Sequence, residues 1–81
     1  MNKLLTFELE KGLESLEIHC NKETLSDLIN ILEKIKEERI NTNTKLLTTV
    51  LLTDAWGGDT LTSEKQGDDN ILINKVKIII W

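Results

Sequence analysis

The architecture is set by residues 5–35, which read LTFELEKGLESLEIHCNKETLSDLINILEKI. Apolar and polar residues alternate over 5–9 and again over 16–20, and the segment between these runs contains Gly12. Successive side chains of a strand point to opposite faces, so two alternating runs joined by a short turn predict a β-hairpin. From residue 22 onward the apolar spacing becomes helical. The stretch therefore predicts a strand pair followed directly by a helix.

The predicted helix runs from Lys22 to Glu38, and Asn21 stands where an N-cap is expected. Thr24 and Asp27 offer an alternative cap, because a hydroxyl residue followed three positions later by an acid is typical of a helix start. The stripe predicted to face the core consists of Leu25, Leu28, Ile29, Leu32 and Ile35, with Ile31 at its edge.

The second half of the chain adds two predicted strands, at 46–53 and 71–81, after a polar turn at 41–44. A long acidic loop at 54–70 separates them, so the element order is ββαββ. We expect one α+β domain over all 81 residues, with a four-stranded sheet and the helix packed on one face. The other sheet face is then either solvated or used for binding.

Composition limits the functions open to this chain. The 81 residues hold 10 Lys and Arg against 14 Asp and Glu, and the net charge of −4 disfavours nucleic acid as a partner. The single cysteine, Cys20, allows no internal disulfide, which favours the cytoplasm. No apolar run approaches the ~18 residues of a membrane-spanning helix, so no membrane partner is expected.

Catalytic and metal-binding arrangements are not favoured either. His19 and Cys20 are neighbours in a predicted strand, so they point to opposite faces; we expect Cys20 in the core and His19 beside Glu17. The acids of the 54–70 loop lack the spacing of a calcium loop. Gly57-Gly58 is not followed by the lysine of a phosphate-binding loop. We expect no catalytic residue, no metal and no cofactor.

Trp56 lies in the long loop between Asp54 and Gly57-Gly58-Asp59. Two roles are open to it: an anchor folded onto the sheet, which is the commoner role, or a hot spot for binding. Trp81 is predicted on the sheet face that the helix leaves uncovered. Two exposed tryptophans near one surface would form an interaction patch.

Three segments of the second half occur in a fixed order: Trp56-Gly57-Gly58 after a predicted strand, then 61–66 (LTSEKQ), then 74–78 (NKVKI). In this order and at these gaps they resemble the immunity protein 32 family of bacterial polymorphic toxin systems. The resemblance covers most of residues 48–81, and the first half fits in outline. It departs from the family at Thr48-Thr49-Val50, where members carry histidines, so a site built on those histidines is absent or altered here.

The resemblance implies a small cytoplasmic protein that binds and neutralises a cognate toxin through a protein–protein interface, without catalysis. The acidic charge suits a basic partner, and many nuclease toxins are basic. The alternative is an interaction or regulatory module unrelated to toxins, homodimeric through the uncovered sheet face. Such a dimer would set acids against bases around a two-fold axis. The residues expected on that face are Glu8, Glu10, Lys75, Lys77, Ile79 and Trp81.

The predicted partner-binding surface combines the 54–70 loop with the exposed ends of the last two strands. Four short strands present a face of roughly 400 Å², and the loop supplies the rest of the ~800 Å² that a stable interface needs from each partner. The residues assigned to this surface are Trp56, Asp59, Glu64, Gln66, Asp69, Asn70, Lys77 and Trp81. The competing interpretation is that Trp56 and the segment 66–70 only pin the loop to the sheet.

Overall fold

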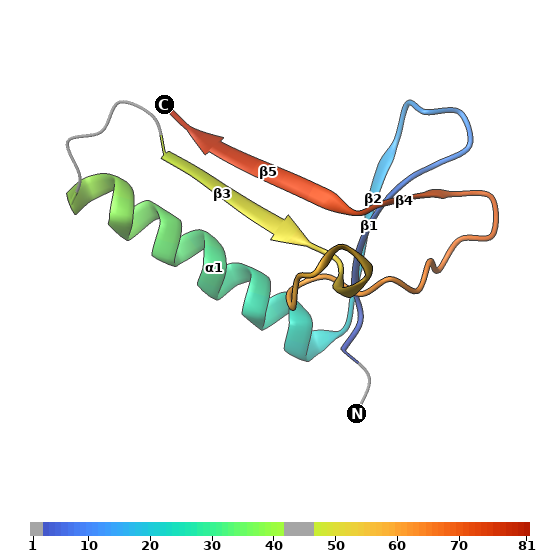
Figure 1. Ribbon diagram of the computed structural model, residues 1–81, viewed down its shortest axis with the longest axis horizontal. Coiled ribbons are helices and arrows are strands. Elements are labelled where there is room, and N and C mark those ends of the chain that lie inside the picture. Colours follow the sequence, from blue (N-terminus) through green and yellow to red (C-terminus); the bar gives the residue numbers. More distant parts are fainter. Residues whose placement is uncertain (1–2, 42–46) are drawn as a thin grey trace.

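A computed structural model describes residues 3–41 and 47–81, and the turn expected at 41–44 falls outside these ranges apart from Asn41. The described residues form one α-helix, one short 3₁₀ helix and five strands (Figure 1). These are β1 (Leu5–Leu9), β2 (Leu16–Cys20), α1 (Lys22–Asn41), β3 (Leu47–Leu52), η1 (Asp54–Trp56), β4 (Ile71–Ile73) and β5 (Lys75–Ile80). The predicted α+β class is confirmed.

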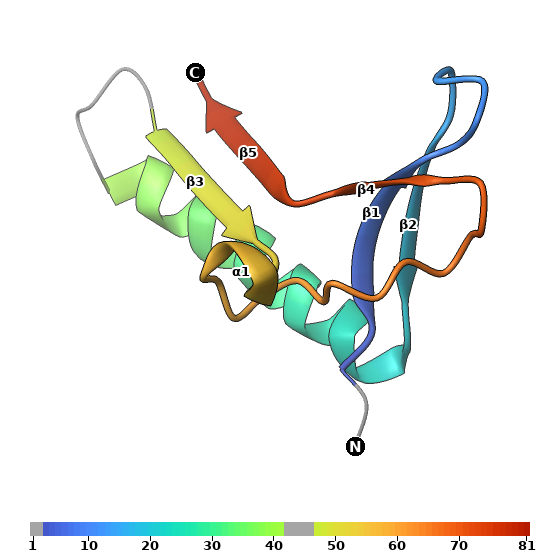
Figure 2. The same cartoon turned by 45° about the vertical axis from the view of Figure 1, so that its right-hand side comes forward.

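The strands form two antiparallel sheets, so the expected single four-stranded sheet is wrong. β1 pairs with both β2 and β4, whereas β3 pairs with β5. The cause is Asn74, where the expected last strand bends and divides into β4 and β5. Thr53 holds this corner: its backbone N–H donates to Asn74 O at 3.0 Å, and its hydroxyl donates to Asn74 Oδ1 at 2.8 Å. The two sheets diverge from there (Figure 2).

The predicted hairpin is confirmed. Leu5 pairs with Cys20 and Leu9 pairs with Leu16, so alternate residues of β1 face opposite sides of the sheet. In the turn, the Leu13 N–H donates to Glu10 O at 2.8 Å, and Leu13 adopts a left-handed φ of 59°. Leu5 and Phe7 consequently face the core, whereas Thr6 and Glu8 face the long loop.

Asn21 caps α1 as predicted. The Thr24 N–H donates to Asn21 Oδ1 and the Asn21 N–H donates to Thr24 Oγ1, both at 2.9 Å. This reciprocal pair satisfies backbone donors that the helix itself leaves unpaired. The Thr24 hydroxyl also hydrogen-bonds to Leu4 O, just before β1. The cap therefore fixes the start of the helix against the hairpin and buries Thr24.

The stripe by which α1 packs is rotated from the predicted one. Three of the residues expected in the core, Leu25, Ile29 and Leu32, are 45 %, 47 % and 46 % exposed. Two apolar stripes adjoin on this helix, and periodicity alone does not distinguish them. The burial of Thr24 by its cap contacts selects the stripe that starts there. The residues that face the core are Thr24, Leu28, Ile31 and Ile35.

The core is small and lies where the two sheets meet α1. Its fully buried members are Leu5, Phe7, Leu51 and Leu61, with Cys20 packed against them as predicted. Leu61 comes from the long loop, so this loop contributes to the core. No helix in the described part of the chain is both long and apolar enough to span a membrane.

Candidate functional site

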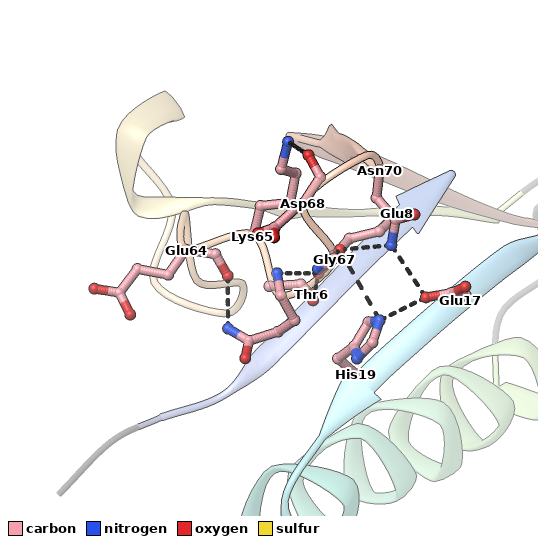
Figure 3. Close-up of polar contacts among 10 residues, drawn as sticks. Thr6, Glu8, Glu17, His19, Glu64, Lys65, Gly67, Asp68 and Asn70 are labelled. Carbon is pink, nitrogen blue, oxygen red and sulfur yellow. Dashed lines mark hydrogen bonds and ion pairs between the residues drawn. The ribbon is translucent and has the colours of Figure 1, made fainter. Parts of the chain in front are cut away.

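A buried carboxylate, Glu8, anchors the second part of the long loop (Figure 3). The sequence analysis placed Glu8 on an exposed strand face, which is wrong because the segment 64–70 crosses over it. Its Oε2 accepts hydrogen bonds from the Thr6 hydroxyl at 2.5 Å and the Gln66 N–H at 3.0 Å. Its Oε1 accepts from the Gly67 N–H and from Asn70 Nδ2, both at 3.0 Å. Four donors thus surround one negative charge.

These contacts decide the ionisation of Glu8. Burial opposes the charge and by itself would raise the pKa. The hydrogen bonds from Thr6, Gln66, Asn70 and Gly67 outweigh burial and lower the pKa of Glu8 from its ordinary value of 4.5 to about 2. The carboxylate is therefore anionic at neutral pH, and hydrogen bonds to a charged acceptor are stronger than neutral ones. The loop is fixed to β1 by such bonds.

The polar network continues to β2. Asn70 Nδ2 also donates to Glu17 Oε1 at 3.0 Å, and Glu17 Oε1 lies 2.8 Å from His19 Nε2. The predicted pairing of His19 with Glu17 is confirmed, and Cys20 faces the opposite side, against the core. A His–Cys catalytic pair is therefore not formed. The described residues contain no group of three or more His, Cys, Asp or Glu side chains placed to bind a metal.

The first part of the loop presents Trp56 on a constrained turn. Gly57 adopts a left-handed φ of 87°, and its N–H donates to Asp54 O at 3.1 Å. A Cβ on Gly58 would lie 2.4 Å from Leu52 O, so only glycine fits there. Trp56 itself is 59 % exposed, so it is not a buried anchor; Leu61, which is 2 % exposed, anchors this part of the loop.

Acidic side chains line a shallow pocket of about 350 Å³ next to η1. Its charged lining consists of three acids, Asp54, Asp59 and Glu64, and one base, Lys3. The Ser63 hydroxyl hydrogen-bonds to Asp54 Oδ1, and the Ala55 N–H donates to the same oxygen at 3.1 Å. These bonds, the one from Ser63 above all, hold the pKa of Asp54 below its usual value. We call Trp56 and these three acids the Trp56 surface.

Two of the residues predicted to bind a partner, Gln66 and Asn70, take part in the loop anchor, although Gln66 is exposed. Gln66 donates its backbone N–H to Glu8, and its side-chain amide donates to Glu64 O at 3.0 Å. Asn70 points inward and bridges Glu8 to Glu17. Asp69 is exposed in the same segment. The interpretation of residues 66–70 as a structural pin therefore holds for Gln66 and Asn70.

Trp81 lies away from the Trp56 surface, whereas Lys77 lies partway along the β3–β5 ribbon, paired with Val50. Leu52, next to η1, pairs with Lys75, whereas Leu47 at the far end of β3 pairs with Ile80. A six-residue strand spans about 20 Å, so Trp81 lies at the opposite end of the β3–β5 ribbon from Trp56 (Figure 1). The two tryptophans do not share a surface.

Sequence reasoning missed Asp54 as part of the Trp56 surface and Lys3 as part of the pocket lining. It also missed Thr6, Glu8 and Glu17 as parts of the anchor. Asp54 stands two positions from Trp56, which is a signal that could have included it; nothing in the sequence marks the others. Comparison of the chain with protein families, with curated proteins and with solved structures gives no match to any of them.

Proposed function

We propose that this protein is an immunity protein that binds and neutralises a basic bacterial toxin through the Trp56 surface, without catalysis. The observation that carries the proposal is that Trp56 is 59 % exposed on a turn whose backbone is tightly fixed. A rigidly held aromatic side chain loses little conformational entropy on binding, and tryptophan is enriched among the residues that dominate interface energies.

The charge around Trp56 indicates the chemistry of the partner. Asp54, Asp59 and Glu64 line one pocket, and the whole chain carries a net charge of −4. Such a surface attracts a positively charged protein at long range and disfavours an acidic one. Toxins that cleave nucleic acids have basic surfaces because their substrate is a polyanion. A cytoplasmic nuclease toxin is therefore the partner class that fits.

The segments that resemble the immunity protein 32 family have separate roles in this arrangement. Trp56-Gly57-Gly58 forms the exposed turn, and the second segment contributes Glu64 to the pocket and Gln66 to the anchor. The third segment begins with Asn74, at the corner between the sheets. All three segments therefore contribute to presenting one surface, which supports a binding function for it.

The test is binding of the full chain to the toxin domain encoded beside its gene, measured by isothermal titration calorimetry. We expect Trp56→Ala to weaken affinity at least tenfold, and Asp59→Ala and Glu64→Ala about fivefold each. Trp81→Ala is the matched control. It removes a tryptophan that is 85 % exposed at the other end of the ribbon, and we expect unchanged affinity.

The outcomes of this titration locate the binding surface and distinguish an immunity protein from an interaction module unrelated to toxins. Weakening by Trp81→Ala as well would extend the binding surface along β5, as the sequence predicted. Wild-type affinity in Trp56→Ala would remove the Trp56 surface from the interface. Failure of the wild-type chain to bind that domain would overturn the immunity function and favour an interaction module unrelated to toxins.

A further inference from the structure

A broad apolar face lies uncovered between α1, β5 and the hairpin of β1 and β2. Large aliphatic side chains on this face are between 45 % and 55 % exposed, although they lie beside the core. They are Leu16, Ile18, Leu25, Ile29, Leu32 and Ile71. We call this set the aliphatic face. Isolated exposed leucines are ordinary, but a contiguous group of this size on a small protein marks an interaction surface.

Strand register places three of these residues on one side of the larger sheet. Ile18 pairs with Phe7, a core residue, while Leu9 pairs with both Leu16 and Ile71. Residues paired directly across two strands project from the same face, and so do residues two apart in one strand. Leu16, Ile18 and Ile71 therefore project on the core side of the sheet, beyond the reach of the helix.

The exposed stripe of α1 lies on the flank of the helix opposite the long loop. Asp27 and Lys34 lie on one flank of α1 and line pockets with Thr60 of the long loop. Leu25 and Leu32 lie on the opposite flank of the buried stripe, because each residue advances 100° around the helix. That flank is turned away from Thr60 of the long loop, and the hairpin and β5 diverge from each other (Figure 2).

The protein exposes more surface than a compact chain of its size. A monomer of 9.3 kDa is expected to expose about 5,000 Å², and this chain exposes 5949 Å². Its radius of gyration is 13.8 Å, against about 12 Å expected for a compact domain of this length. The excess of about 1,000 Å² is of the same order as the ~800 Å² that each partner contributes to a stable interface.

We propose that a second copy of this chain covers the aliphatic face, in a two-fold symmetric homodimer. The six residues are all aliphatic, and permanent homodimer interfaces are more apolar and poorer in charge than those between independently folded proteins. Two chains of net charge −4 repel each other, so their contact is favoured where charges are few.

This interface differs from the dimer expected from the sequence. The dimer expected from the sequence set Glu8 and Glu10 against Lys75 and Lys77. Glu8 is not available for such a contact, because it is buried beneath Gln66 and Gly67. The aliphatic face also lies on the other flank of α1 from Asp59, which lines a pocket with Asp27. The proposed dimer therefore leaves the Trp56 surface open, and it does not depend on the proposed immunity function.

The test is the mass of the full chain in solution, measured by size-exclusion chromatography with light scattering at about 50 µM. The wild-type protein is expected at about 19 kDa, twice the chain mass of 9.3 kDa. Ile29→Glu places a charge in the interface and is expected to weaken association at least a hundredfold, giving a monomer. Ile79→Glu is the matched control, because Ile79 is 44 % exposed on the other face of β5. It should remain dimeric.

Leu32→Glu repeats the disruption at a second helical position, and glutamate preserves helix propensity. Circular dichroism confirms that each variant is folded. A wild-type mass of 9.3 kDa at this concentration overturns the proposal. A dimeric Ile29→Glu beside a monomeric Ile79→Glu also overturns it and places the interface on the face first expected from the sequence.

Discussion

Glu8 is the residue whose surroundings most affect the stability of this protein. A carboxylate that is 0 % exposed pays a large desolvation cost unless donors surround it, and four donors do so here. Two of them, the N–H groups of Gln66 and Gly67, belong to a loop that contributes no strand at this point. The Glu8 carboxylate and the loop therefore stabilise each other. Removing the carboxylate leaves the N–H groups of Gln66 and Gly67 without their acceptor, and displacing the loop leaves the buried charge without two of its donors.

Replacing Glu8 with glutamine tests this dependence. The amide nitrogen of Glu8→Gln is a donor placed where the native oxygen accepts hydrogen bonds, so buried N–H groups lose their acceptor. We expect a loss of about 2–3 kcal/mol in the free energy of unfolding, measured by urea titration. Glu10→Gln, one residue beyond the end of β1, is the control and should change stability by less than about 0.5 kcal/mol. Equal effects of the two substitutions would contradict the anchor role.

Acid stability provides a second test of Glu8. The unfolded chain takes up a proton at this residue near pH 4.5, whereas the folded protein does so only near pH 2, because its pKa is about 2. Protons therefore favour unfolding between these values. The contribution of Glu8, at most about 3 kcal/mol, is fully present above pH 4.5 and is lost as the pH falls towards 2.

The measurement is the urea midpoint from pH 6 down to pH 2, compared between the wild-type chain and Glu8→Gln. The wild-type midpoint should fall more steeply below pH 4.5, because glutamine has no proton to take up. Parallel curves for the two proteins would show that Glu8 is not ionised differently in the folded state.

Among the elements, the divided last strand has the largest effect on the fold. β4 and β5 are separated by Asn74 alone, yet they belong to different sheets. Thr53, which is fully buried, donates both its N–H and its hydroxyl to Asn74 at this corner. The same corner positions η1, which begins at the residue after Thr53. The bend therefore sets where Trp56 is presented.

A double-mutant cycle measures the side-chain contact at this corner. Asn74→Ala and Thr53→Val each remove one partner of the hydroxyl–amide bond and leave the backbone bond intact. We expect each to destabilise the fold by about 1–2 kcal/mol, with a coupling energy of about 1 kcal/mol between them. Thr48→Val, at an exposed position of β3, is the control. Additive effects of Asn74→Ala and Thr53→Val would show that the bend does not depend on this bond.

At the scale of the whole molecule, the protein is open and has two dissimilar surfaces. Its extents are 43 × 31 × 22 Å, and its core is built on few fully buried side chains. The aliphatic face lies on one flank of α1, and the acidic pocket of the Trp56 surface adjoins the other. Long-range charge and short-range apolar burial thus act at separate places.

The salt dependence of toxin binding should separate the long-range attraction of a basic partner from the short-range contacts that hold the complex together. Steering of a basic partner by the Trp56 surface is screened as the Debye length shortens from about 14 Å to about 4 Å. Raising NaCl from 0.05 M to 0.5 M should therefore slow association at least tenfold while changing dissociation little, as measured by surface plasmon resonance with the neighbouring toxin domain. An association rate independent of salt would contradict a basic partner. Light scattering at both salt concentrations controls for changes in the dimer.

The elements predicted correctly are those that short-range patterns specify. The hairpin follows from alternation within 5–9 and 16–20, and the helix start follows from Asn21 and its bond to Thr24. The failures lie elsewhere. The sequence predicted a continuous last strand because its apolar residues run past Asn74 on both sides. It also placed Leu25, Ile29 and Leu32 in the core stripe of α1, because they satisfy helical spacing together with Leu28 and Ile35, which do face the core.

The sequence by itself determined the α+β class, the hairpin, the capped helix and the opposite orientations of His19 and Cys20. Each depends on residues a few positions apart, whose geometry is fixed by the period of a strand or a helix. Only the tertiary structure decided that Glu8 is buried and that the Trp56 surface is separate from Trp81. Glu8 meets Gln66 across 58 positions of the chain. Contacts over such separations depend on how the elements pack, which local periodicity does not encode.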